Sequence, residues 1–140
     1  MTEPTAGYRY IPHPADLCVE AWAPTQKQCL VQVVDALVDS FIERPRPRAS
    51  EAIEWVLPDD QTENLLGTLL EEVIYQLEVH SRIPVATAIE REENGWRVRF
   101  EMADLDQATP CGAVPKAVSL HGMRLRPEGN RWRCVVTIDV

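Results

Sequence analysis

The 140-residue sequence lacks the signatures of the common catalytic sites. It has no glycine-rich phosphate loop, no Gly-x-Ser-x-Gly turn around a nucleophilic serine and no His-Glu-x-x-His zinc motif. Histidine is scarce, with three copies at His13, His80 and His121. These absences narrow the range of enzymatic functions that the chain can carry.

Long apolar runs are absent as well, since no segment approaches the roughly 18 residues that a membrane-spanning helix needs. Residues 1–7 have neither the basic start nor the apolar stretch of a signal peptide. The sequence contains no Cys-x-x-Cys pair, so zinc or redox chemistry has little support. We therefore expect a cytoplasmic protein with mostly buried free thiols among its cysteines, Cys18, Cys29, Cys111 and Cys134.

Positive charge is in short supply, because the net charge is −8 at neutral pH. A chain of this charge repels phosphate backbones over most of its surface. The charge is uneven: residues 1–115 carry 20 acidic and 9 basic side chains, whereas residues 116–140 carry 2 acidic and 5 basic ones. The acidic part suits a cation or a basic protein partner.

Hydrophobic patterning predicts two helices. Thr25 and Gln28 form a capping box, and apolar residues recur at helical spacing from there to about Phe41. Pro58, Asp59 and Asp60 are typical of the end of a strand and the N-terminal cap of a helix. A helical stripe of mostly leucine residues follows to about Val79.

Alternating apolar residues predict several strands, with a strong hairpin turn at Asn94 and Gly95. The expected strands cover residues 8–11, 16–23, 52–57, 85–92, 96–102, 117–120, 123–126 and 131–140. The composition, 45% hydrophobic and 26% charged, is that of an ordinary globular domain. We expect one α+β domain over residues 1–140, with two helices packed on a mainly antiparallel sheet.

Two aspartates are candidate metal ligands. Asp16 stands at the start of a predicted strand, where a carboxylate can cap a turn or bind a hard cation. Asp139 lies near the end of the last predicted strand, which holds its carboxylate close to the main-chain carboxylate of Val140. Two such groups repel each other unless a cation or hydrogen-bond donors relieve them. Solvated side chains remain the alternative, and the two aspartates share a site only if their strands are neighbours.

Arginines form two basic features. Arg44, Arg46 and Arg48 alternate with prolines on an extended loop that we interpret as solvated, with contact to RNA as the alternative. A second group lies on one face of the last predicted hairpin, where it is either the solvent side of the sheet or a patch for phosphate or an acidic partner: Arg124, Arg126, Arg131 and Arg133.

Several segments taken together resemble the archease family. Residues 8–16, Tyr-Arg-Tyr-Ile-Pro-His-Pro-Ala-Asp, are similar to its signature strand and His-Thr-Ala-Asp turn. Residues 60–77 resemble its acidic, leucine-rich second helix, and residues 114–121 resemble its Lys-Ala-Val-Thr-Tyr-His segment. Residues 136–140, Val-Thr-Ile-Asp-Val, are similar to its Asp-Ile ending. The resemblance covers nearly the whole chain, with the segments in the right order.

The resemblance implies an α+β fold in which the first and last segments meet. It implies a divalent cation, calcium first and magnesium or manganese as alternatives, bound by Asp16, Asp139 and the carboxylate of Val140. It also implies an accessory protein without catalytic residues of its own. Such a protein activates an RtcB-type RNA ligase, promoting its guanylylation and multiple turnover in tRNA splicing or RNA repair, and meets RNA only through the ligase. Pro14 replaces the family's threonine, so we expect altered support around Asp16.

Two other functions stay open from the sequence. A chaperone-like modulator of nucleic-acid-processing enzymes would bind several unrelated partners without metal. A metal-dependent hydrolase built on Asp16 and His13 lacks a recognisable nucleophile and base.

Overall fold

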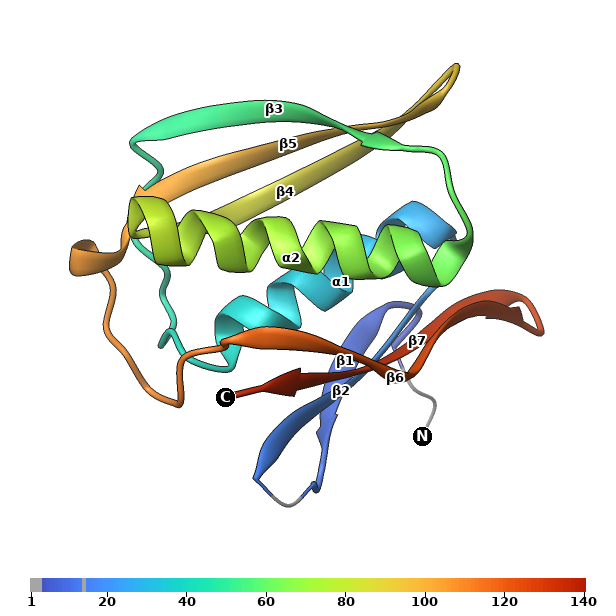
Figure 1. The fold of residues 1–140 in the computed structure, drawn as a ribbon, viewed down its shortest axis with the longest axis horizontal. Coiled ribbons are helices and arrows are strands. Elements are labelled where there is room, and N and C mark those ends of the chain that lie inside the picture. The colour runs from blue at the N-terminus through green and yellow to red at the C-terminus, as the bar shows by residue number, and fades with distance from the viewer. Residues whose placement is uncertain (1–3, 14) are drawn as a thin grey trace.

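The computed structural model describes residues 4–13 and 15–140, and it arranges them in three layers (Figure 1). The helices are α1 (Gln26–Asp39) and α2 (Thr62–His80). The strands are β1 (Gly7–Ile11), β2 (Asp16–Ala23), β3 (Glu51–Pro58), β4 (Arg82–Glu92), β5 (Gly95–Asp104), β6 (Ala117–Glu128) and β7 (Arg131–Asp139). They form a four-stranded sheet, in the order β1-β2-β7-β6, and a three-stranded sheet, in the order β3-β5-β4.

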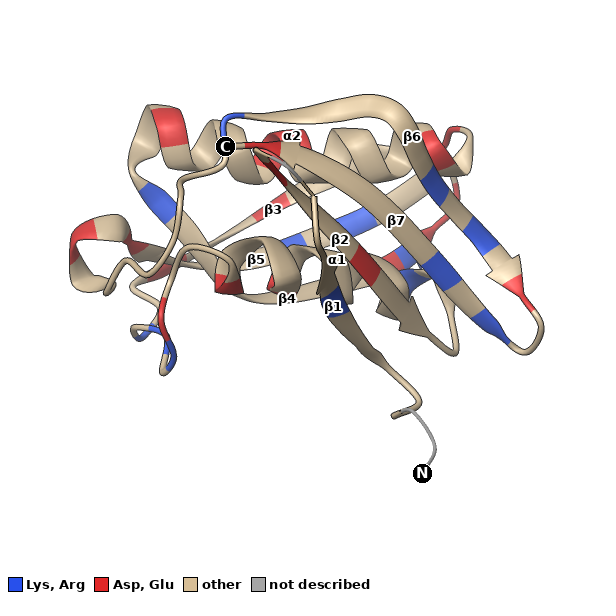
Figure 2. Cartoon of the chain, turned by 90° about the horizontal axis from the view of Figure 1, so that it is seen from below, with Lys and Arg blue, Asp and Glu red and all other residues tan. Residues whose placement is uncertain are grey.

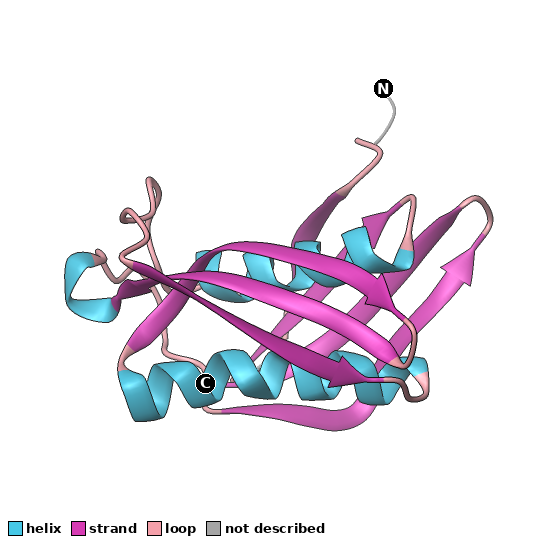
Figure 3. Ribbon diagram, turned by 90° about the horizontal axis from the view of Figure 1, so that it is seen from above, coloured by secondary structure: helices cyan, strands magenta, loops and turns pink. Residues whose placement is uncertain are grey.

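The two helices lie between the two sheets. Figure 2 views the molecule from the side of the four-stranded sheet, and Figure 3 views it from the side of the three-stranded sheet. All strand pairs are antiparallel, and the four-stranded sheet joins strands from the two ends of the described chain. The predicted α+β class, with two helices and antiparallel strands, is confirmed. The division of the strands into two sheets goes beyond the single sheet that the sequence suggested.

Local sequence explains the helix boundaries. The hydroxyl of Thr25 accepts the backbone N–H of Gln28 at 3.2 Å, which confirms the predicted start of α1. Helix α2 begins at Thr62, slightly later than expected, while the carboxylate of Asp60 accepts the N–H of Gln61 at 2.7 Å. Ser81 ends α2 in a left-handed conformation with φ 51°, which closes the helix.

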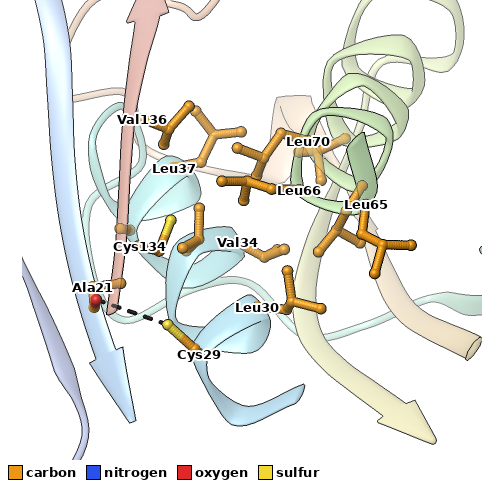
Figure 4. Close-up of a cluster of buried hydrophobic side chains, with 14 of the residues drawn as sticks. Ala21, Cys29, Leu30, Val34, Leu37, Leu65, Leu66, Leu70, Cys134 and Val136 are labelled. Carbon is orange, nitrogen blue, oxygen red and sulfur yellow. Dashed lines mark hydrogen bonds between the residues drawn. The ribbon is translucent and has the colours of Figure 1, made fainter. Parts of the chain in front are cut away.

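Apolar side chains from all three layers meet in one core. Leu30, Val34 and Leu37 of α1 face leucines of α2, with Val136 of β7 packed beside them (Figure 4). Each fully buried leucine or valine contributes roughly 1.5–3 kcal/mol to folding. This core fixes the four-stranded sheet against the helices, and it therefore fixes where residues on the sheet's outer face stand.

Strand β6 differs from its prediction. It is one strand where two were expected, and its register against β7 shifts between Ser119 and Arg124. Gly122 lies in this irregularity with φ 73°, a conformation that glycine adopts without strain. Among the described helices, none is long and apolar enough to cross a membrane.

The four cysteines are all free, and Cys18, Cys29 and Cys134 are buried, as predicted. Burial raises the pKa of Cys29 to about 12, so its thiol is inert at neutral pH. Cys111 is exposed.

Candidate metal centre

Asp16 and Asp139 stand directly opposite each other on neighbouring strands. Asp16 is the first residue of β2, Asp139 is the last residue of β7, and the two are register partners in the antiparallel pair. Side chains of directly opposed residues project from the same face, with Cβ atoms about 4.5–5.5 Å apart. The condition that the sequence could not test, adjacency of the two strands, is therefore met in the structure.

The end of β7 is held on both sides. Asp139 is paired with Asp16 on one side and with Ala117 of β6 on the other, and its carbonyl accepts the N–H of Lys116 at 2.8 Å. Val140 follows immediately, and its half-buried side chain packs against the core. The backbone of this corner is thus fixed by the sheet, while the aspartate side chains stay accessible.

The turn before β2 is also constrained. Ala15 has φ 65°, a left-handed conformation that a residue with a Cβ adopts only at a cost. His13 lies across the turn, with its Nδ1 3.9 Å from Oδ2 of Asp16. Pro14, where altered support for Asp16 was expected, lies outside the described residues.

No lysine or arginine among the described residues pairs with the two carboxylates. The side chain of Asp16 is 34% exposed, and its ion-pair neighbour is His13, which is charged only when protonated. Asp139 is exposed, and no hydrogen bond or ion pair joins its side chain to another residue in the described part of the chain. Two unneutralised carboxylates on adjacent strands raise the local negative potential and attract a cation.

The donor set fits a hard cation that keeps part of its coordination open. Asp16 and Asp139 offer oxygen atoms only, which calcium and magnesium prefer. Across residues 4–13 and 15–140 no group of three His, Cys, Asp or Glu side chains could hold a metal ion. An ion bound here would therefore take its further ligands from Val140, from water or from a partner.

The predicted arginine groups have different surroundings. Arg46 was interpreted as solvated, and this interpretation is wrong, since its side chain is 9% exposed and pairs with Asp35 and Asp39. Arg44 also pairs with Asp39, at 2.9 Å. These salt bridges fold the loop back onto α1. The second group lies as predicted on the outer face of β6 and β7, with Arg126 opposite Arg133.

Sequence reasoning missed this cluster around Asp39. The hydroxyl of Tyr8 also donates to Asp39, and Arg46 reaches the carbonyl of Val85 at 3.1 Å. A signal was present, because Asp35 and Asp39 are spaced one helical turn apart just before an arginine-rich loop. The cluster ties β1, α1 and β4 together, so its role is structural.

The protein is a small layered α+β domain, with two helices between two antiparallel sheets. Its candidate metal centre is the aspartate pair where an early and a late strand meet. Residues 8–140 match the Archease protein family (MTH1598/TM1083). The chain belongs to the archease family.

Individual proteins similar to this chain are also named as archeases. A protein of Mycobacterium tuberculosis named "Probable protein archease" is 40% identical over 136 residues, which cover 97% of this chain and 76% of that protein. "Protein archease" of Methanopyrus kandleri is 28% identical over 136 residues, covering 93% of this chain and 96% of that protein.

Solved structures share the fold. The crystal structure of a Thermotoga maritima protein, described as an archease and possible chaperone, aligns with a TM-score of 0.70 at 20% identity, over 100% of this chain and 98% of that one. The solution structure of protein 1598 from Methanobacterium thermoautotrophicum aligns with a TM-score of 0.75 at 15% identity, over 96% and 99% of the two chains. At these identities the likeness shows the fold alone.

Proposed function

We propose that this chain is a metal-binding accessory protein that activates an RtcB-type RNA ligase in tRNA splicing or RNA repair. The observation that carries the proposal is the direct opposition of Asp16 and Asp139 across β2 and β7, with Val140 next in the chain. Family membership supports it, and so do the four free cysteines, which suit the reducing cytoplasm where we expect the protein to act.

The chemistry of the corner suits an accessory role. Carboxylates of this kind cannot themselves form a phosphodiester bond, but they can hold or exchange a divalent ion, with calcium as the first candidate. Asp16, Asp139 and the carboxylate of Val140 would hold the ion, which would neutralise the pair and supply a Lewis acid for oxygen atoms of a partner. The protein thereby promotes guanylylation and multiple turnover of the ligase. It does so by arranging an ion beside the ligase's own metals or by holding the conformation that accepts GTP.

The decisive test is guanylylation of the ligase from the same organism with and without this protein. Asp16→Asn and Asp139→Asn remove one charge each with little change in shape, and we expect each to lower the stimulation at least about tenfold. Asp106→Asn, in the short helix that follows β5, is the matched control, since Asp106 is exposed and far along the chain from both strands. Full stimulation by both folded variants of the pair would remove the proposal.

Direct calcium titration by calorimetry separates metal binding from ligase activation. The 140-residue chain should bind calcium, and Asp139→Asn should weaken binding by about tenfold or more, as expected for loss of a metal ligand. One glycine added after Val140 converts the carboxylate there to an amide, and it should also weaken binding. Equal titrations for the extended and unextended chains would exclude Val140 as a ligand.

The second candidate is a chaperone-like modulator of nucleic-acid-processing enzymes. It draws support from the Thermotoga maritima relative, which is described as a possible chaperone. It predicts binding to several unrelated enzymes, unchanged by chelator and by Asp16→Asn. Binding restricted to the ligase, and abolished by chelator, would count against it.

A further inference from the structure

The outer face of the four-stranded sheet carries a group of arginines at the end remote from the aspartate pair. We call it the arginine surface: Arg124 and Arg126 of β6 with Arg131 and Arg133 of β7. Figure 2 shows blue bands, which mark Lys and Arg, along β6 and β7 away from the C label. Arg126 stands directly opposite Arg133. Like charges at opposed positions of a sheet repel each other.

Neutralisation on this face is partial. Glu20 of β2 is 7% exposed and accepts Nε of Arg133 at 2.8 Å, and it is also bonded to Arg9. Burial alone raises the pKa of Glu20, but the hydrogen bonds from Arg133 and Arg9 outweigh burial and hold its pKa below the ordinary value. Glu128 of β6 stands directly opposite Arg131, and its carboxylate lies 3.9 Å from Arg133. Glu20 and Glu128 therefore balance the β7 side of the arginine surface, which leaves the β6 side, Arg124 and Arg126, as the part open to an anion.

Arg124 and Arg126 are not bonded to an acidic side chain in the described part of the chain. A nearby charge is that of Glu63 of α2, whose pKa is lowered by the N–H of Leu125, at 3.1 Å, and to a smaller extent by the charge of Arg126. Within the described residues no carboxylate forms an ion pair with either side chain, and the guanidinium of Arg124 donates to the carbonyl of Met123 at 2.9 Å. Arginines elsewhere in the chain form ion pairs with Asp or Glu, namely Arg44, Arg46, Arg82, Arg91, Arg97 and Arg99. Arg48 has no acidic ion-pair partner among the described residues either, but it stands on the loop between α1 and β3. In a chain of net charge −8, two neighbouring unpaired cations on a fixed strand are a surface for an anion.

The surroundings favour a regular polyanion over a protein. Interfaces between proteins depend on buried apolar anchors at their centre. The exposed large apolar side chains of the described chain lie outside residues 124–133: Tyr10, Val56, Tyr75, Val79, Val114 and Leu120. Arg124 and Arg126 are two residues apart on one strand, which spaces them about 7 Å along β6. Evenly spaced guanidinium groups match the repeated phosphates of a nucleic-acid strand.

We propose that the arginine surface binds the phosphate backbone of single-stranded RNA. The choice of RNA rests on the proposed function, whereas the cationic surface does not. Asp139 and Arg133 are six residues apart on β7, so the RNA lies about 20 Å from the aspartate pair. The acidic remainder of the chain repels phosphate, which restricts RNA to this face. RNA is then held beside the metal centre without competing for its cation.

Fluorescence anisotropy with a labelled uridine 12-mer and the full chain tests this without the ligase. We expect a dissociation constant on the order of 100 µM at physiological salt, and two phosphate contacts, from Arg124 and Arg126, give a slope of about −1.4 for log K against log salt. Arg124→Gln combined with Arg126→Gln should weaken binding at least about tenfold in low salt and reduce the slope by about 1.4. Replacing both by lysine should keep most of the affinity, because lysine retains the charge.

The matched control is Arg97→Gln combined with Arg99→Gln, which removes two charges at the same spacing on β5 of the other sheet. It should leave binding within about twofold of wild type. Equal loss in the control, or undetectable binding by the wild type in low salt, overturns the proposal. Competition by a glutamate 12-mer as effective as that by unlabelled RNA also overturns it and points to an acidic protein. A chain that stimulates the ligase but binds no RNA ends this inference and leaves the proposed function standing.

Discussion

Two pairs of aspartates in this chain have opposite surroundings. Asp35 and Asp39 lie one turn apart on α1, and Arg46 bonds to both, at 3.0 Å and 2.9 Å. Asp16 and Asp139 face each other across β2 and β7, and the basic side chain near them is that of His13, 3.9 Å from Asp16 and charged only when protonated.

Burial explains the difference. The side chains of Asp39 and Arg46 are each 9% exposed and that of Asp35 is 25% exposed, whereas that of Asp16 is 34% exposed and Asp139 is exposed. A buried carboxylate must find a cation within the protein, because removal of water from an unpaired charge costs several kcal/mol. An exposed pair can remain unpaired and take its cation from outside. Compensated aspartates therefore stabilise the fold, and uncompensated ones are available to a ligand.

Removal of Arg46 should give the largest effect. Arg46→Met keeps the apolar stem but leaves Asp35 and Asp39 without their shared cation, so we expect a loss of about 3–5 kcal/mol in the free energy of unfolding. Urea denaturation measures this directly. Arg48→Met on the same loop is the control and should change the value by no more than about 0.5 kcal/mol. A loss below about 1 kcal/mol for Arg46→Met would mean that the cluster around Asp39 does not hold the layers together.

Acid should weaken the same cluster to a smaller extent. Burial raises the pKa of Asp39, but hydrogen bonds from Arg44, Tyr8 and Arg46 outweigh it and hold the pKa below the ordinary 3.8. A carboxylate with a lower pKa in the folded state stabilises the fold above about pH 4. That contribution is lost as the pH falls through the folded-state pKa.

The comparison of wild type with Asp39→Asn isolates this contribution from the titration of the other carboxylates. The variant should be less stable at pH 7, and the gap between the two proteins should shrink as the pH falls from about 5 to about 2. Urea denaturation across this range measures the gap. Asp106→Asn, whose aspartate is exposed, should show no such convergence. If the difference in stability between wild type and Asp39→Asn stays constant with pH, the ionised carboxylate of Asp39 does not stabilise the fold.

Much of the fold could be predicted from the sequence, because helix caps and apolar periodicity are local. The capping box at Thr25 and the alternation in β7 are confirmed in the structure. Strand β2 forms as predicted, but residues 18–23 are all buried, so its predicted alternation is wrong. Strand partners are not local, and periodicity does not reveal which strands share hydrogen bonds. The split into two sheets therefore came only from the structure.

The candidate site shows the same limit. The residue type and strand position of Asp16 and Asp139 made them candidates, but their opposition depends on a register between strands more than 100 residues apart, which only the resemblance anticipated. Arg46 shows the converse. Its proline-rich neighbourhood predicts an extended loop, yet its burial depends on how that loop folds back onto α1 and β4.

The smallest expected effect is the most direct test of the contrast between the two aspartate pairs. With calcium removed by chelator, Asp139→Asn should stabilise the fold by about 0.2–1 kcal/mol, because it relieves the repulsion between opposed carboxylates. Asp106→Asn should give no gain under the same conditions. In calcium the wild type should be more stable than Asp139→Asn, since an ion that binds only the folded wild type stabilises it by mass action. A loss of stability for Asp139→Asn in chelator would show that protein contacts already satisfy Asp139. It would then resemble Asp39, and the distinction between a structural and an available pair would fail.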